Sequence, residues 1–252
     1  MGLYRVTLAY DGTDFLGWQA QPSGARTVQG VLEEALRRLG DGGRVPVTAA
    51  GRTDAGVHAL GQVASFDLGR PMPPEDLARA LNGLMPDDVR VLDCAPAPPS
   101  FHPRKSAASK LYRYLLDTGP VRLPQRRRLA GHVPWRLDEA RIRAAAATYV
   151  GRHDFASLAS SGGSVKTTVR TITRSEAAFD GGTLVYEVEA DGFLRKMVRS
   201  LVGGLVVGRP LRLPKAGEAP ALQAFPAIRK VHHTRCATLS ARCTHSPSAW
   251  IP

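Results

Sequence analysis

Cysteine is scarce in this sequence, with three residues among 252. Cys94, Cys236 and Cys243 have no regular spacing, which excludes a disulfide framework of the kind that stabilises small secreted domains. Long apolar runs are absent too: the longest, at 201–208, is far shorter than the roughly 20 residues that a membrane-spanning helix needs. The chain opens without an apolar leader segment. We therefore expect a cytoplasmic protein with no membrane contact.

Acidic residues are few compared with basic ones. The chain has 34 Lys and Arg against 22 Asp and Glu, so its formal net charge is +12. Its 43% of hydrophobic residues is ordinary for a folded chain and excludes a mostly disordered one. The excess charge fits a general solubility margin. It also fits a polyanionic partner, because basic side chains that neutralise phosphates release condensed counterions.

Apolar periodicity predicts a mixture of strands and helices in each half of the chain. We expect strands near 4–10, 44–50, 62–68, 89–94, 110–117, 167–179 and 184–190, and helices near 28–39, 73–84, 137–150 and 193–207. This order lacks a regular βαβ alternation and indicates an α+β fold. The proline-rich stretch 95–100 cannot continue a sheet. We therefore divide the chain into 1–100, 101–208 and an atypical tail at 209–252.

The loop at 51–62 is the first candidate for chemistry. Gly51 and Gly56 bracket Arg52 and Asp54, so the backbone can turn tightly and approach a ligand. An arginine and an aspartate two residues apart can serve one charged site, but they are equally typical of a surface turn. His58 follows among apolar residues, which favours a hydrogen-bonded structural histidine over a base or a ligand.

Further along the chain, three other features allow two interpretations each. Tyr112 lies on an expected strand, where aromatic residues usually pack against neighbouring strands. Arg195 and Arg199 are four residues apart on an expected helix, a spacing that also occurs on solvated helix faces. The basic run at 126–128 suits either phosphate contacts or a solvated loop.

Five ordered motifs carry a resemblance to a known family. They are YDGTDFLGWQ at 10–19, GRTDAGVHALGQV at 51–63, FHPR at 101–104 with KLYRY at 110–114, GRHDF at 151–155 with TVRTI at 168–172, and GFLRKMVR at 192–199. Together they resemble the tRNA pseudouridine synthase A family over about residues 3 to 208. Their number and order make chance similarity very improbable.

The resemblance implies a fold, a reaction and partners. The expected fold is two ferredoxin-like α+β halves joined along a central antiparallel sheet, with a cleft between them. The expected enzyme is an isomerase that converts uridine to pseudouridine at positions 38–40 of the tRNA anticodon stem-loop. It works as a homodimer on tRNA. We expect no cofactor and no metal, because the reaction includes neither a redox step nor a hydrolysis.

The resemblance also assigns roles to individual residues. Asp54 corresponds to the catalytic nucleophile, and Arg199 to the basic residue that forms an ion pair with it. Tyr112 corresponds to the aromatic residue that stacks on the target base, with a possible part in proton transfer. Arg52 corresponds to the arginine that helps to displace the nucleotide. The expected substrate-binding set is Tyr112, Arg52, His58 and Gln62.

Elementary chemistry explains why the reaction needs these residue types. Uracil must leave C1′, rotate and rejoin through C5, so the nucleotide must first leave its stack. A carboxylate can attack C1′ or remove the 2′ proton to give a glycal, and the sequence leaves both routes open. A guanidinium beside Asp54 favours the charged carboxylate. An aromatic face under the free base is worth about 1–3 kcal/mol.

From about residue 210 the resemblance ends. The tail shows no clear amphipathic period, and we expect that an altered tail lacks the strand that would close the active site. A metal site is a weaker alternative, because the clustered side chains match no standard zinc spacing: His232, His233, Cys236, Cys243 and His245. Two other functions stay open, a non-catalytic RNA-binding protein on the same fold and a metal-dependent hydrolase that uses Asp54 and His58.

Overall fold

The computed structural model describes residues 2–159, 166–207 and 232–238 of the chain. In chain order its strands are β1 (Gly2–Tyr10), β2 (Thr48–Ala49), β3 (His58–Leu68), β4 (Val89–Pro96), β5 (Ala107–Asp117), β6 (Gly131–His132), β7 (Gly151–Asp154), β8 (Val169–Asp180), β9 (Thr183–Ala190) and β10 (His232–Thr238). Its α-helices are α1 (Val28–Leu39), α2 (Pro74–Leu84), α3 (Glu139–Ala147) and α4 (Met197–Val207), with short 3-10 helices η1 (Gly12–Asp14), η2 (Pro124–Arg126) and η3 (Ala156–Leu158).

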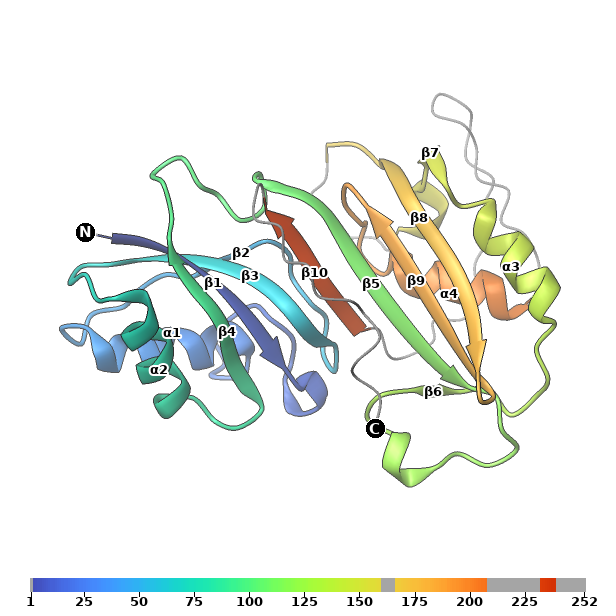
Figure 1. Ribbon diagram of the computed structural model, residues 1–252, viewed down its shortest axis with the longest axis horizontal. Coiled ribbons are helices and arrows are strands. Elements are labelled where there is room, and N and C mark those ends of the chain that lie inside the picture. The colour runs from blue at the N-terminus through green and yellow to red at the C-terminus, as the bar shows by residue number, and fades with distance from the viewer. Residues whose placement is uncertain (1, 160–165, 208–231, 239–252) are drawn as a thin grey trace.

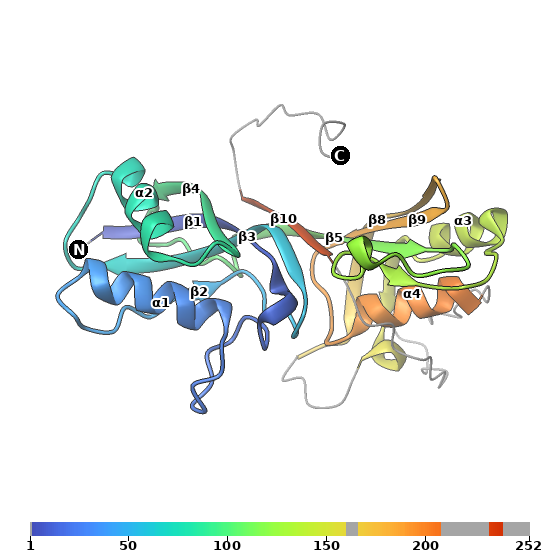
Figure 2. The same cartoon turned by 90° about the horizontal axis from the view of Figure 1, so that it is seen from below.

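The strands form one sheet that runs the length of the molecule (Figure 1). Its order is β4-β1-β3-β10-β5-β9-β8-β7, with β2 beside β3 and β6 beside β5. Pairing is antiparallel except between β10 and β3 and between β5 and β6. Seen from below, α1 and α4 lie on the same face of the sheet (Figure 2). The expected α+β class with a central, mainly antiparallel sheet is confirmed.

We use "N-terminal half" for β1 to β4 with α1 and α2. In β1, buried and partly exposed residues alternate from Leu3 onward, so one face of the strand enters the core. Helix α1 has the expected ends: the Thr27 hydroxyl accepts the Gly30 amide at 3.2 Å, and Gly40 follows the last residue. The expected strand at 44–50 is reduced to β2, because Pro46 lacks the amide donor that a strand ladder needs.

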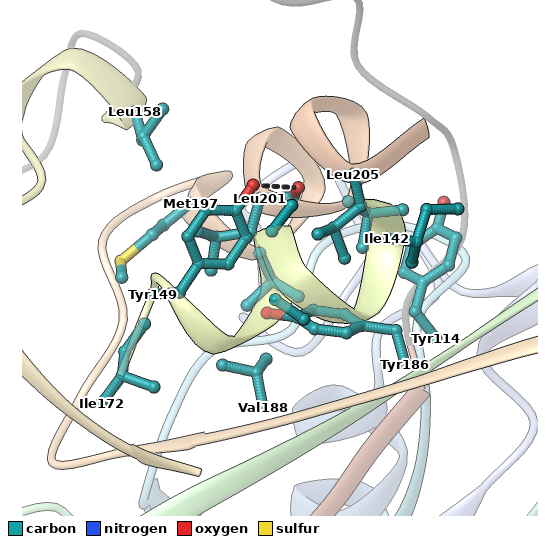
Figure 3. Close-up of a cluster of buried hydrophobic side chains, with 14 of the residues drawn as sticks. Tyr114, Ile142, Tyr149, Leu158, Ile172, Tyr186, Val188, Met197, Leu201 and Leu205 are labelled. Carbon is teal, nitrogen blue, oxygen red and sulfur yellow. Dashed lines mark hydrogen bonds between the residues drawn. The ribbon is translucent and has the colours of Figure 1, made fainter. Parts of the chain in front are cut away.

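We use "C-terminal half" for β5 to β9 with α3 and α4. The expected hairpin is present, and Gly181 and Gly182 adopt the positive φ values that its turn requires. Helices α3 and α4 pack on a separate hydrophobic core, shown in Figure 3. There the Tyr149 hydroxyl donates to the Leu201 carbonyl at 3.3 Å. Burial raises the pKa of Tyr149 well above its usual range, so the residue stays neutral.

Strand β10 joins the two halves. Its backbone pairs in parallel with β3, where His232 faces His58, and antiparallel with β5. Figure 1 shows it at the centre of the sheet, between a strand of each half. The expectation that the closing strand is missing from the tail is therefore wrong. The sequence did not indicate this strand, because its position depends on pairing with β5 and β3, about 125 and 175 residues earlier in the chain. A local pattern does not reveal such distant partners.

Helix α4 begins at Met197 instead of at the expected 193. Lys196 has φ = 62°, and this left-handed conformation cannot belong to a right-handed helix. This start places Arg199 in the first turn of α4, at the end of the helix that reaches Asp54 of the N-terminal half. None of the helices in the described ranges is long and apolar enough to span a membrane.

Candidate active site

The Asp54 loop, residues 50–57, is held by the first sequence motif. The Gly17 φ of 96° lets the chain pass close to the loop, and the Trp18 amide donates to the Thr53 carbonyl at 3.0 Å. From the other side, the Gly56 amide donates to the Phe15 carbonyl at 3.2 Å. The Thr53 side chain shares a hydrogen bond with the Tyr10 hydroxyl at 2.9 Å. The motif at 10–19 therefore holds the backbone of the Asp54 loop in place through hydrogen bonds.

Gly12 makes the closest approach to this loop. A Cβ atom at this position would lie 1.9 Å from the Val57 carbonyl oxygen, so only glycine fits. We expect Gly12→Ala to destabilise the protein by about 1–3 kcal/mol or more, because backbone must move to relieve the clash. Urea denaturation measures the change. In the matched variant Gly43→Ala the new methyl group meets no atom within 4 Å, and stability should hold. Equal midpoints for the two variants would contradict the packing argument.

Residues of three other segments support the base of the loop. The Gln62 amide nitrogen on β3 donates to the Gly51 carbonyl at 2.7 Å. Phe101, from the FHPR motif, packs against the small buried cluster of Ala50 and Val63. On β5, the Lys110 ammonium lies 3.4 Å from where a Cβ of Gly51 would stand. Sequence reasoning assigned no role to Phe101 or Lys110, although both lie in the motifs that it identified.

Asp54 and Arg199 meet across the two halves. Arg199 Nη2 lies 3.5 Å from Asp54 Oδ2, as an ion pair slightly longer than a hydrogen bond. The Asp54 side chain is 47% exposed and that of Arg199 only 15%, so the arginine is the more buried partner. The expected pair is therefore brought together in the structure. Its geometry leaves a carboxylate that solvent and substrate can reach, oriented by a largely enclosed guanidinium.

Tyr112 on β5 contacts the segment that leads into α4. Its ring meets the Phe193 ring edge-on, with centroids 4.9 Å apart. Phe193 belongs to the same GFLRKMVR motif as Arg199, so this contact links the tyrosine strand to the arginine helix. Sequence reasoning gave Phe193 no role; its position beside Gly192 in the motif was the available signal.

The remaining expected site residues lie in different surroundings. Arg52 is exposed on the loop, and no ion pair of its side chain is found within the described residues. His58 and Gln62 are buried, at 4% and 0% exposure. The ring nitrogens of His58 contact Asp11 and the Arg128 carbonyl, and Gln62 holds Gly51. These contacts are structural, so substrate binding by His58 and Gln62 stays a prediction.

The basic run at 126–128 is not simply a solvated loop. Arg126 Nε donates to both carboxylate oxygens of Asp117, at 3.0 and 2.9 Å, and its Nη2 donates to the Thr183 hydroxyl at 3.2 Å. This places Arg126 in a structural network at the ends of β5 and β9. Arg128 reaches the N-terminal half, where its Nη1 lies 3.8 Å from Asp11.

The structure describes no side chain among the possible metal ligands of the tail. Cys243 and His245 lie outside the described residues. Only the backbone of 232–238 is described, and among the side chains that the structure describes elsewhere no group of three or more His, Cys, Asp or Glu is arranged to hold a metal ion.

Comparison with known proteins identifies the family of this chain. A family model described as tRNA pseudouridine synthase matches residues 7–104 and 145–219. The chain is 45% identical to tRNA pseudouridine synthase A of Latilactobacillus sakei, over 81% of this chain and 82% of that protein. It is 46% identical to the Pelobacter propionicus enzyme of the same name, over 83% and 85%. It is 40% identical to tRNA pseudouridine synthase A of Neisseria gonorrhoeae, over 87% of this chain and 83% of that protein. The chain belongs to the tRNA pseudouridine synthase family, and it is an isomerase that acts on tRNA.

Proposed function

We propose that Asp54 is the nucleophile and that the substrates are uridines of the tRNA anticodon stem-loop. The single observation that carries the role of Asp54 is its ion pair with Arg199, at 3.5 Å. Arg199 comes from the other half of the molecule, so the fold itself assembles a carboxylate and a guanidinium from distant segments. A half-exposed carboxylate held in this way can reach C1′ of a nucleotide that has left its stack.

The reaction conserves all atoms of the nucleoside. The N1–C1′ bond breaks, uracil rotates, and a C5–C1′ bond forms; C5 then loses a proton and N1 gains one. Asp54 either forms an ester at C1′ that C5 displaces, or removes the 2′ proton to give a glycal. Arg199 orients the carboxylate of Asp54 in both routes. Because electrons and atoms balance without a further reagent, the proposal includes no cofactor.

We assign substrate contacts to Arg52 and Tyr112. Arg52 extends from the exposed side of the Asp54 loop, where a guanidinium can bind a phosphate or fill the place of the displaced nucleotide. Tyr112 supplies an aromatic ring that Phe193 contacts edge-on, and we assign this ring to stacking against the uracil. The chain carries a net charge of +12, which favours binding of the polyanionic tRNA backbone.

Two variants separate the ring of Tyr112 from its hydroxyl group. We expect Tyr112→Leu to lower kcat/KM about 10-fold to 100-fold, because base stacking is worth about 1–3 kcal/mol. We expect Tyr112→Phe to stay within about threefold of wild type, because it keeps the stacking face. Steady-state assays with tRNA transcripts measure both. A Tyr112→Phe enzyme as slow as Tyr112→Leu would show instead that the hydroxyl removes the C5 proton.

The further parts of the proposal concern assembly and location. We infer a cytoplasmic homodimer in which one tRNA contacts both subunits, with 1–100 and 101–208 as the halves that hold the substrate between them. The support is the family's activity on tRNA together with the basic charge of the chain. Analytical ultracentrifugation of the protein with and without tRNA tests the stoichiometry, and a single subunit per tRNA would contradict it.

One experiment tests the proposed reaction and its site on the RNA. The protein is incubated with unmodified tRNA transcripts, and pseudouridine is mapped by chemical modification and primer extension. Product in the anticodon stem-loop is the expected result, and product elsewhere would contradict the substrate assignment. A non-catalytic RNA-binding protein on the same fold would retain tRNA affinity and form no product.

A further inference from the structure

His58 is a buried titratable residue that directly follows the Asp54 loop, and the proposed reaction has no use for it. Its side chain is only 5% exposed. Nδ1 lies 3.1 Å from a carboxylate oxygen of Asp11, and Nε2 lies 2.7 Å from the carbonyl oxygen of Arg128. The ring therefore stands between two oxygen atoms at hydrogen-bonding distance, one from each half of the molecule.

We propose that His58 is an imidazolium that positions the Asp54 loop by linking the N-terminal half to the C-terminal half. A peptide carbonyl can only accept a hydrogen bond, and so can an ionised carboxylate. A neutral imidazole carries a single N–H, so it would direct a lone pair at one of the two oxygen atoms. Only the doubly protonated ring satisfies both partners. The inference rests on the proposed role of Asp54.

The charge state of Asp11 supports this assignment. Burial opposes ionisation of its carboxyl group, but hydrogen bonds from Thr13 and the charges of His58 and Arg128 outweigh that effect and lower its pKa. Asp11 is then a carboxylate at neutral pH and has no proton to give to Nδ1. Among the described side chains, the Asp11 carboxylate lies against Nδ1 of His58, and the Arg128 guanidinium lies 3.8 Å from the other oxygen of Asp11; the backbone register partner of His58 on β10 is His232.

The two ends of the link are themselves fixed. Asp11 directly precedes Gly12, which lies against Val57 of the Asp54 loop. Arg128 lies two residues beyond Arg126, which is bonded to Asp117 on β5. The hydrogen bonds of His58 therefore join the back of the loop to the sheet of the C-terminal half. The Asp54–Arg199 ion pair also joins the two halves. The link through His58 therefore fixes the position of Asp54 relative to Arg199.

Deprotonation of His58 removes one of these two hydrogen bonds. The loop can then shift against Arg199, and a displacement of about 1 Å in an active site costs up to about 100-fold in rate. We expect kcat to fall roughly 10-fold to 100-fold above the pH at which His58 loses its proton. The effect should appear in kcat, because the shift separates Asp54 from Arg199.

Nuclear magnetic resonance of the free protein tests the charge of His58 without any assay of activity. With 15N-labelled histidine, both ring nitrogens of His58 should carry hydrogen at pH 7. The His58→Gln variant should lack the signals of this ring, which assigns them to His58. A ring with one bare nitrogen at pH 7 would overturn the proposal. If wild type forms no pseudouridine, the proposed function fails, but this measurement still decides whether the ring is charged.

A pH series tests the positioning role. The loss of kcat at high pH should share its midpoint with the His58 titration, and Asp11→Asn should lower both midpoints together because it removes the facing negative charge. His132→Gln is the matched control: His132 also bonds a carbonyl oxygen, that of Gly119, but both residues belong to the C-terminal half, so this variant should leave both midpoints unchanged. A kcat that stays flat while His58 loses its proton would overturn the positioning role.

Discussion

Asp54→Asn should abolish pseudouridine formation, lowering kcat by at least about 10⁴-fold, as is typical when a nucleophile is removed. The amide keeps the size and shape of the carboxylate but cannot form an ester at C1′ or remove a proton from C2′. Because Asp54 is 47% exposed, the substitution leaves the cores of both halves intact. Affinity for tRNA should stay within a few-fold of wild type. Single-turnover assays and filter binding measure the two quantities.

The control is the same substitution elsewhere in the same half. Asp67→Asn changes an exposed aspartate near the end of β3, on the strand that follows the Asp54 loop, and should leave kcat unchanged. If Asp54→Asn forms product at the wild-type rate, Asp54 is not the nucleophile. The non-catalytic alternative predicts a different result, in which wild type and Asp54→Asn both bind tRNA and neither forms product. A metal-dependent hydrolase would instead respond to chelators, which we expect to leave product formation unaffected.

Local features of the sequence predicted much of the fold. The Thr27 cap and the apolar period that follows it define α1 to the residue, and the proline and acidic residues at 73–76 mark the start of α2. Asp180-Gly181-Gly182 marks the turn of the β8–β9 hairpin. These features were readable because caps and turns depend on residues a few positions apart.

Other features depend on distant partners, so the sequence did not show them. Strand β10 takes its place from β3 and β5, and nothing in the tail's local pattern distinguishes it from a loop. Pro96 ends β4 within the stretch that we expected to break the sheet. This is possible because β4 is an edge strand, where a missing amide donor leaves no partner unsatisfied.

In the candidate active site too, motifs identified some residues, whereas the roles of others depend on contacts that only the fold creates. Asp54 and Arg199 could be named from motifs, and the structure brings them together. Sequence could not distinguish a histidine that binds substrate from one that holds the loop, because that difference lies in its neighbours. Asp11 and the Arg128 carbonyl come from segments 47 residues before and 70 residues after His58, and only folding places them around the ring.

Arg199→Met should lower kcat by about 10²–10³-fold, the usual cost of removing a group that stabilises charge in an active site. Methionine fills much of the volume of the arginine stem but leaves the Asp54 carboxylate without its counter-charge. Arg199→Lys should recover part of the loss, because an ammonium restores the charge without the planar donor fork. Arg79→Met, on α2, is the control: Arg79 is 77% exposed and pairs with an exposed aspartate of the same helix, so kcat should not change.

Removing either member of the Asp54–Arg199 ion pair should lower the free energy of unfolding, but by different amounts. Arg199 is 15% exposed and Asp54 is 47% exposed, so removing the aspartate leaves an enclosed guanidinium without its carboxylate, whereas removing the arginine leaves a carboxylate that water can solvate. Asp54→Asn should therefore lower the free energy of unfolding more than Arg199→Met does, with the double variant close to Arg199→Met alone. Urea denaturation of the four proteins completes this double-mutant cycle. Additive losses would mean that the two groups do not interact in the folded protein, and the ion pair would then have no part in orienting Asp54.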